Sequence, residues 1–237
     1  KANSIVKSTR AGFIQTLLTI AAGFSTSINL FGMPNFKKRN VAILIFDEAE
    51  VLDFAGPFEV FSVTSELRNY EPFRVFTISE TTNPIKAVNG LTIIPDYAIN
   101  DHPPIDILII AGGSGTKRLL TNSSVLGWIE KIQATSEYTL SICSAARLLG
   151  KLGLLNGKPF CTHHEVYDHL KEIAPTALPQ KDKRFVQSGE RLYTSGGISA
   201  GIDLSFHIVE KLLGSEAARQ TATYMEYRLI KSICYAN

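Results

Sequence analysis

Cys143 is the residue of this chain that is best placed for covalent chemistry. It ends the apolar, β-prone stretch 138–143, and the small, helix-prone residues 144–150 follow without a loop. A side chain at such a junction lies on a sharp, strained turn at the carboxyl edge of a sheet. The amides of the following helix point at it and favour a thiolate over a thiol. The junction predicts a cysteine nucleophile, and inert packing in the core is the alternative.

Two other predicted strand ends bring an acid and glycines to the same edge. The apolar run 41–46 is followed by a turn-and-helix segment that contains Asp53, and the run 105–110 is followed by Gly112 and Gly113. Ligands of an open parallel sheet bind outside the carboxyl ends of its strands, so the three ends should converge there. A thiolate needs a proton-exchange partner and a developing oxyanion needs amide donors. These residue types could supply both.

The remaining candidates have simpler explanations beside the chemical ones. His163 could carry protons next to the thiol, or it could be a hydrogen-bonded structural histidine. The histidines at 164 and 169 are one residue too far apart for the zinc-protease motif, and we expect no metal site. Glu59 is expected on a solvated helix face, and Cys161 is expected to pack in the core. The glycine-rich run 112–117 resembles a phosphate-binding loop but lacks P-loop and dinucleotide spacing, so we expect an oxyanion turn there.

The elements that must position these residues alternate between strand and helix. Strands are predicted at 41–46, 73–79, 105–110, 138–142, 159–162, 184–188 and 191–194; helices are predicted at 56–68, 114–120, 123–135, 144–153, 164–173, 199–213 and 215–229; a hairpin is predicted through Asn89 and Gly90. This order predicts an α/β fold, a flavodoxin-like doubly wound sheet that is mostly parallel with helices on both faces.

Composition agrees with one globular domain. The chain has 237 residues, of which 45% are hydrophobic, and its net charge of +2 is spread without a basic patch, so a nucleic-acid partner is not expected. Its three cysteines are irregularly spaced, which excludes a disulfide framework and fits reduced thiols in a cytoplasm.

Residues 1–39 are predicted to be an extension that precedes a domain spanning 40–237. Basic residues at its start precede a chargeless stretch, which could indicate a signal peptide or a membrane anchor. Apolar side chains from Phe13 to Ile28 fall on one side of a helix and threonines and glutamine on the other. We therefore expect an amphipathic helix packed on the domain or across a dimer interface; export or membrane association is the alternative.

From about Asn40 to about Arg228 the chain resembles the ThiJ/PfpI family of the class I glutamine amidotransferase-like superfamily. The matching motifs are Leu-Asp-Phe-Ala-Gly-Pro at 52–57, Asn-Gly-Leu at 89–91, Ala-Gly-Gly at 111–113, Ser-Ile-Cys-Ser-Ala-Ala at 141–146, Thr-His at 162–163 and Thr-Ser-Gly-Gly at 194–197. The pattern is most similar to the isonitrile hydratase-like branch, whose catalytic domain also occurs fused to helix-turn-helix modules in transcriptional regulators.

The resemblance implies roles for the residues already singled out. It implies that Cys143 is the nucleophile, that Asp53 is an acid hydrogen-bonded to its sulfur and that Ser144 supplies a hydroxyl beside it. It places oxyanion amides at Gly113 and at the peptide after the cysteine, and it implies a homodimer.

Several positions depart from the family pattern, among them the pair Gly196-Gly197, which stands where Ala-Gly is usual. Ser144 stands where threonine is usual, Ala145 replaces a common glycine and Arg147 replaces an apolar residue. Arg147 lies one helical turn from the thiol, and a cation there should change which substrate is accepted.

The sequence therefore predicts a cysteine-dependent hydratase or hydrolase that acts on a small electrophile such as an isonitrile, a reactive carbonyl or an amide-like group. Substrate contacts are expected from Gly112, Gly113, Ala145 and Arg147, without a metal or cofactor. A non-enzymatic ligand or oxidation sensor, related to the ligand-binding domain of transcriptional regulators, is one alternative. A cysteine peptidase or a glyoxalase-like enzyme is the other.

Overall fold

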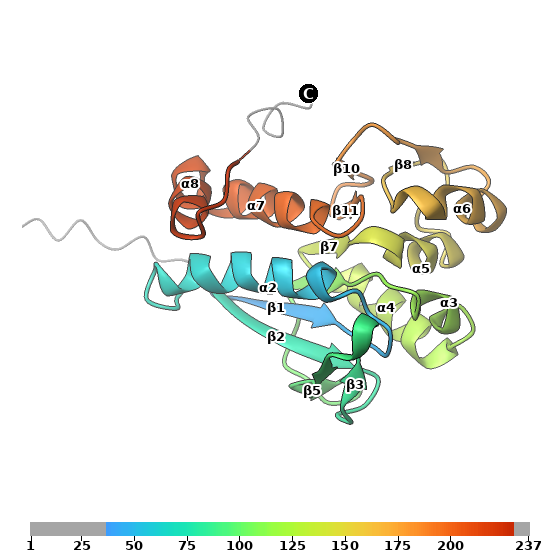
Figure 1. Cartoon of the computed structure of the whole chain (residues 1–237), viewed down its shortest axis with the longest axis horizontal. Helices are drawn as coiled ribbons and strands as arrows, with labels where there is room; N and C mark the ends of the chain where they lie inside the picture. Colours follow the sequence, from blue (N-terminus) through green and yellow to red (C-terminus); the bar gives the residue numbers. More distant parts are fainter. Residues whose placement is uncertain (1–36, 230–237) are drawn as a thin grey trace, which may run out of the picture. The chain divides into compact units, whose positions relative to one another are not determined.

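The computed structural model describes residues 37–229, and a seven-stranded sheet forms the centre of this part of the chain (Figure 1). The strand order is β10-β11-β7-β6-β1-β2-β5, and every neighbouring pair is parallel except β10 with β11. The strands are β1 (Arg39–Leu44), β2 (Phe73–Ser79), β5 (Tyr97–Ala98), β6 (Ile107–Ile110), β7 (Tyr138–Ser141), β10 (Phe185–Gln187) and β11 (Leu192–Ser195). The predicted mostly parallel α/β sheet is confirmed.

Helices follow the strands, and α2 and α7 pack against each other (Figure 1). The helices are α2 (Val51–Glu66), α3 (Thr116–Leu119), α4 (Ser123–Thr135), α5 (Ala146–Lys151), α6 (Tyr167–Ile173), α7 (Ala200–Leu213) and α8 (Ser215–Tyr224). Single 3₁₀ turns are η1 (Val88–Gly90), η2 (Cys143–Ala145) and η3 (His164–Val166). Two small ladders pair β3 (Ile85–Lys86) with β4 (Thr92–Ile93) and β8 (Pro159–Phe160) with β9 (Leu178–Pro179), and the first of them is the predicted hairpin.

The central strands are apolar because both of their faces are covered. Every residue from 41 to 44 in β1 and from 107 to 110 in β6 is buried. A strand that packs helices on both faces reads as an unbroken apolar run, which is why these two segments could be recognised in the sequence.

One predicted boundary is wrong at a position that matters for the site. Helix α2 begins at Val51, five residues before the predicted start, so Asp53 lies in its first turn and Pro57 lies inside it. Pro57 is the seventh residue of the helix, so it lacks an amide that would otherwise donate to the Asp53 carbonyl one turn earlier. Gly56 is needed for packing, since a Cβ there would lie 2.7 Å from Ile202 Cγ1 of α7.

Other predicted boundaries also shift. The helix predicted at 144–153 begins as the tight turn η2, the last helix ends at Tyr224 rather than 229, and the strand predicted at 159–162 pairs over two residues. The expected amphipathic helix over 13–28 lies outside the described residues, as does Cys234. No helix within residues 37–229 combines the length and the apolar character needed to cross a membrane.

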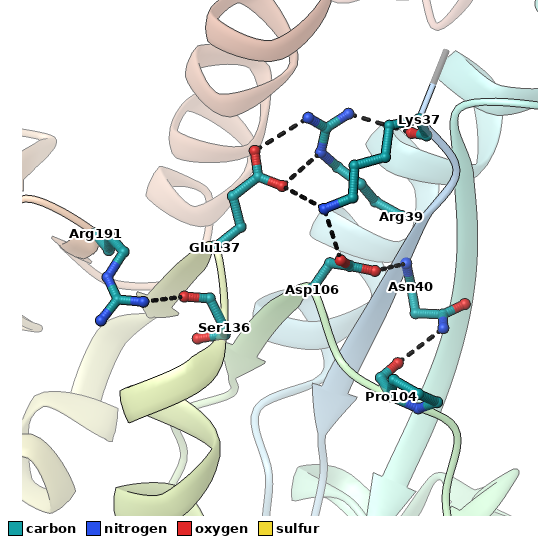
Figure 2. Close-up of polar contacts among 8 residues, drawn as sticks. All are labelled: Lys37, Arg39, Asn40, Pro104, Asp106, Ser136, Glu137 and Arg191. Carbon is teal, nitrogen blue, oxygen red and sulfur yellow. Dashed lines mark hydrogen bonds and ion pairs between the residues drawn. The ribbon is translucent and has the colours of Figure 1, made fainter. Parts of the chain in front are cut away.

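A network of paired charges joins the amino ends of three neighbouring strands (Figure 2). Arg39, at the start of β1, donates two hydrogen bonds to the Glu137 carboxylate just before β7, at 2.8 and 3.0 Å. Asp106, just before β6, accepts from the Asn40 amide at 2.9 Å and pairs with Lys37 at 3.1 Å. These contacts fix where β1, β6 and β7 start, and so help to set where their carboxyl ends meet.

Candidate active site

Cys143 lies on the strained turn that its sequence position predicted. Strand β7 ends two residues before Cys143. The φ of Cys143 is 56°, in the left-handed region that non-glycine residues seldom adopt. Backbone contacts hold this conformation: the Cys143 amide donates to the Gly196 carbonyl at 3.1 Å, and Thr162 Oγ1 donates to the Cys143 carbonyl at 2.8 Å. The side chain is 5% exposed at the bottom of a pocket.

Asp53 is fully buried and meets the thiol from the first turn of α2. Its two oxygens accept separate backbone amides, Oδ2 from Gly112 and Oδ1 from Ile198, each at 3.1 Å. The Cys143 thiol is close enough to this carboxyl group for each to shift the pKa of the other. The acid and the sulfur that the sequence placed on different strand ends are therefore close together.

Two glycines allow this close approach. A Cβ at Gly112 would lie 2.6 Å from Asp53 Oδ2 and 2.7 Å from the Cys143 Cβ. A Cβ at Gly197 would lie 2.4 Å from His163 Cδ2 and 3.4 Å from the sulfur. Any larger residue at either position would separate the acid, the thiol and the histidine.

The pKa values of the pair are shifted in the same direction. Burial raises the pKa of Asp53 to about 7, although the Cys143 thiol and the Gly112 amide oppose it. Burial, followed by the charge of Asp53, raises the pKa of the Cys143 thiol to about 12, although the amides of Ser144 and Ile198 lower it. The resting form at neutral pH is a thiol next to a carboxyl group that titrates near 7.

The expectation of a resting thiolate is therefore wrong for the free protein. The turn η2 follows the cysteine directly, and α5 has only six residues, so the aligned amides that would stabilise an anion are few. Desolvation in the buried site outweighs them.

The Gly113 amide, which the family resemblance assigned to the stabilisation of an oxyanion, is hydrogen-bonded to Ser144 in this structure. Gly113 N–H donates to Ser144 Oγ at 2.8 Å, and this hydroxyl lies 2.9 Å from the Gly113 carbonyl. The amides that act on the sulfur are those of Ser144 and Ile198. Ile198 was not foreseen; a backbone donor has no residue-type signature, and the only hint was the preceding glycine pair at 196–197.

A pocket of about 270 Å³ opens over the sulfur. Its charged and titratable lining comes from four segments and consists of Glu50, Lys117, Cys143, Arg147, His163 and Glu165. Burial lowers the pKa of His163, so its ring is neutral at physiological pH. The ring accepts a hydrogen bond from the Glu165 amide at 3.4 Å, and the structure gives it none with Cys143. The dyad that a cysteine peptidase would need is not formed within the described residues.

Arg147 is 6% exposed, and two polar side chains hold its guanidinium. Nε donates to His169 Nδ1 at 3.0 Å and Nη1 donates to Thr116 Oγ1 at 3.1 Å. Burial lowers the pKa of Arg147, while the proximity of Cys143 raises it. Ala145, which lies between Cys143 and Arg147 in the sequence, is fully buried in the turn η2.

The structural, non-catalytic interpretations of two other residues are confirmed. Glu59 is exposed on α2, and Cys161 is fully buried with its sulfur directed at the carbonyls of Gln180 and Lys183, at 3.2 and 3.3 Å. Across residues 37–229, histidine, cysteine and acidic side chains form no group of three that could hold a metal ion.

The chain is similar to a known protein family and to several known proteins. Residues 39–211 match the DJ-1/PfpI family. An isonitrile hydratase of Pseudomonas putida is 31% identical over 187 residues, which are 79% of this chain and 78% of that protein. The transcriptional regulator GbdR of Pseudomonas aeruginosa is 25% identical over 85% of this chain, which spans only 54% of the regulator's length.

A solved structure shares the fold. A ThiJ/PfpI family protein from Pseudomonas syringae superimposes with a TM-score of 0.74 at 23% identity, covering 87% of this chain and 81% of that one. The resemblance seen in the sequence motifs is confirmed: this chain belongs to the DJ-1/PfpI family.

Proposed function

We propose that this protein is a cysteine-dependent hydratase of small electrophiles, with Cys143 as the nucleophile and Asp53 as the group that accepts and returns its proton. One observation carries the proposal: the thiol that lines the pocket lies beside a buried carboxyl group whose pKa is raised to about 7. General acid–base catalysis is most effective when the catalytic pKa lies near the working pH. The 31% identity to an isonitrile hydratase supports an isonitrile as the first substrate to test.

The first half of the reaction forms a covalent adduct. The Cys143 sulfur bonds to the terminal carbon of the isonitrile as Asp53 removes the thiol proton and delivers it to that same carbon. The product is a thioformimidate attached to the sulfur. Because the proton moves as the bond forms, no free thiolate has to accumulate at the high pKa of this thiol.

The second half adds water and restores the enzyme. Water bonds to the adduct carbon while Asp53 takes one of its protons and passes it to the nitrogen. The carbon–sulfur bond then breaks as the remaining hydroxyl proton returns through Asp53 to the sulfur. The products are an N-substituted formamide and the free thiol, so one water is added and no oxidant or reductant is used.

The test is turnover with adduct trapping. Purified protein is incubated with an alkyl isonitrile, the formamide is quantified, and a quenched sample is mapped by peptide mass spectrometry. We expect formamide release and a mass increase equal to the isonitrile on the peptide that contains Cys143. Formamide absent under conditions in which the protein stays folded would refute the hydratase proposal.

The same assay separates the alternatives. A reactive 2-oxoaldehyde that is consumed while isonitriles are not would favour a glyoxalase-like enzyme, in which the sulfur forms a hemithioacetal. A protein that turns over neither, but whose Cys143 is converted to sulfinic acid by peroxide before Cys161, would favour an oxidation sensor. The raised pKa of Cys143 argues against the sensor, because oxidation proceeds through the thiolate.

The homodimer and the cytoplasmic location stay predictions. Light scattering of the full chain in solution would give the oligomeric state, and fractionation of cells that produce it would give the location. The same measurements on a chain without residues 1–36 would test whether that segment contributes to either.

A further inference from the structure

The guanidinium of Arg147 is a buried cation that no acidic side chain neutralises in the described part of the chain. Its two protein contacts are with the acceptors His169 Nδ1 and Thr116 Oγ1, and neither belongs to an acidic side chain. A guanidinium carries five N–H donors, and these two contacts use two of them. A charge held in a protein interior without a partner of opposite sign is costly, so an unpaired buried arginine needs a reason.

The free donors of Arg147 face the substrate pocket. Over residues 37–229, the buried side-chain polar atoms without a partner are Ser141 Oγ and Tyr193 Oη. Nη2 of Arg147 has no protein acceptor and is not one of these sealed atoms, and Arg147 lines the pocket over the sulfur. Its unused N–H groups are therefore open to whatever occupies that pocket.

Both signs of charge line the pocket. Its cations are Arg147 of α5 and Lys117 of α3. Its acidic residues are Glu50, which precedes α2, and Glu165, which is exposed beside His163. A molecule with one negative end would be oriented with that end toward the cations of α3 and α5.

We propose that the natural substrate is a small electrophile that carries a carboxylate, and that Arg147 is the residue that binds this carboxylate while the electrophilic carbon meets Cys143. This inference rests on the proposed function, because it names the substrate class of the same site. The planar guanidinium donates parallel hydrogen bonds that match a carboxylate. His169 and Thr116 hold the guanidinium plane in place, so its binding edge is set before the substrate arrives.

Two matched alkylating reagents test the charge requirement without turnover. Iodoacetate and iodoacetamide present the same carbon and the same iodide leaving group, and differ in carrying a carboxylate or a neutral amide. In each, sulfur bonds to the methylene carbon, iodide leaves, and Asp53 takes the thiol proton. The measured quantity is the iodoacetate-to-iodoacetamide rate ratio at Cys143, divided by the same ratio for a small neutral thiol.

We expect the normalised ratio of the wild type to exceed unity by about tenfold, as one charge-assisted contact would give. Arg147→Met should return it to near unity, and Arg147→Lys should give an intermediate value because it keeps the charge and loses the planar fork. Lys151→Met removes an exposed cation from the same helix and should leave the ratio unchanged. A wild-type ratio at or below unity, or one that survives Arg147→Met, would overturn the proposal.

A binding measurement keeps this result separate from the fate of the hydratase proposal. If Cys143 reacts with neither reagent, the nucleophile assignment fails, and the anion site is decided by NMR titration of Cys143→Ser with propionate and propionamide. Propionate binding that Arg147→Met weakens about tenfold or more would support the site. Equal affinity for the acid and the amide would reject it. Melting curves show whether each variant is folded. If Arg147→Met is not folded, the comparison of the two ligands or the two reagents on the protein with Arg147 intact decides the proposal.

Discussion

At the amino ends of β1, β6 and β7 the side chains of Lys37, Arg39, Asp106 and Glu137 each face one of opposite sign (Figure 2). At the carboxyl ends, in contrast, Asp53 and Arg147 each lack an ion-pair partner among the described residues. The paired charges have pKa values shifted toward their ionised forms: contact with Arg39 lowers the pKa of Glu137, and contact with Asp106 raises that of Lys37. At the other edge, burial shifts Asp53 and Arg147 toward their neutral forms.

The difference separates stability from chemistry. A paired charge at the amino edge lowers the energy of the folded state and has little left to offer a ligand. An unpaired group at the carboxyl edge raises that energy and stays available to take up a proton or an anion.

Replacing the nucleophile should have the largest effect. Cys143→Ser should reduce turnover by about 10³-fold or more, because a hydroxyl at this position is a far weaker nucleophile. Its melting temperature should stay close to that of the wild type, since serine fits the same turn. Cys161→Ser is the matched control: it should retain activity, and equal losses in the two variants would mean that the effect is structural.

Removing the proton acceptor should come next. Asp53→Asn should lower kcat/KM by about 10²-fold, the usual contribution of a general base. In the wild type kcat/KM should rise with pH through about 7, because Asp53 must be ionised to accept the thiol proton, and this limb should vanish in the variant. Glu59→Gln, an exposed change in the same helix, should behave as wild type. Full activity in Asp53→Asn would assign proton transfer to another group.

Asp53 should also make the protein less stable as pH rises. Its folded pKa of about 7 exceeds the ordinary value of 3.8, so between these values the folded state holds a proton that the unfolded state releases. The free energy of unfolding should therefore fall across this window, by up to about 4 kcal/mol relative to Asp53→Asn. Urea unfolding at several pH values measures the difference, and parallel pH curves for the two proteins would exclude a raised pKa.

Glu137 should change the free energy of unfolding with the opposite pH dependence from Asp53, and by a smaller amount. Its folded pKa is lowered by Arg39, so it contributes stability above its unfolded pKa, which is lost as pH falls through the folded value. Glu137→Gln should cost about 1 kcal/mol at neutral pH and leave turnover unchanged. The same urea series reports it. A loss of activity in this variant would show that the amino edge is not purely structural.

Much of the site could be read from the sequence, because strand ends in a parallel sheet converge. The junction at Cys143 and the run before Asp53 were enough to place an acid near a thiol. The direction of the thiol pKa could not be read, since it depends on how completely Asp53 and Cys143 are desolvated. The hydrogen bond from the Ile198 amide to Asp53 could not be predicted either, because the two residues are 145 positions apart and a backbone donor has no side-chain signature.

Titration of the Asp53 carboxyl carbon by NMR tests the central claim most directly. The protein is labelled with ¹³C at aspartate, and the resonance is assigned by its absence in Asp53→Asn. Our account predicts a pKa of about 7 for this buried carboxyl group in the resting enzyme. A value near the ordinary 3.8 would contradict it, because Asp53 would then be a weaker base whose pKa lies far from the working pH at which general acid–base catalysis is most effective.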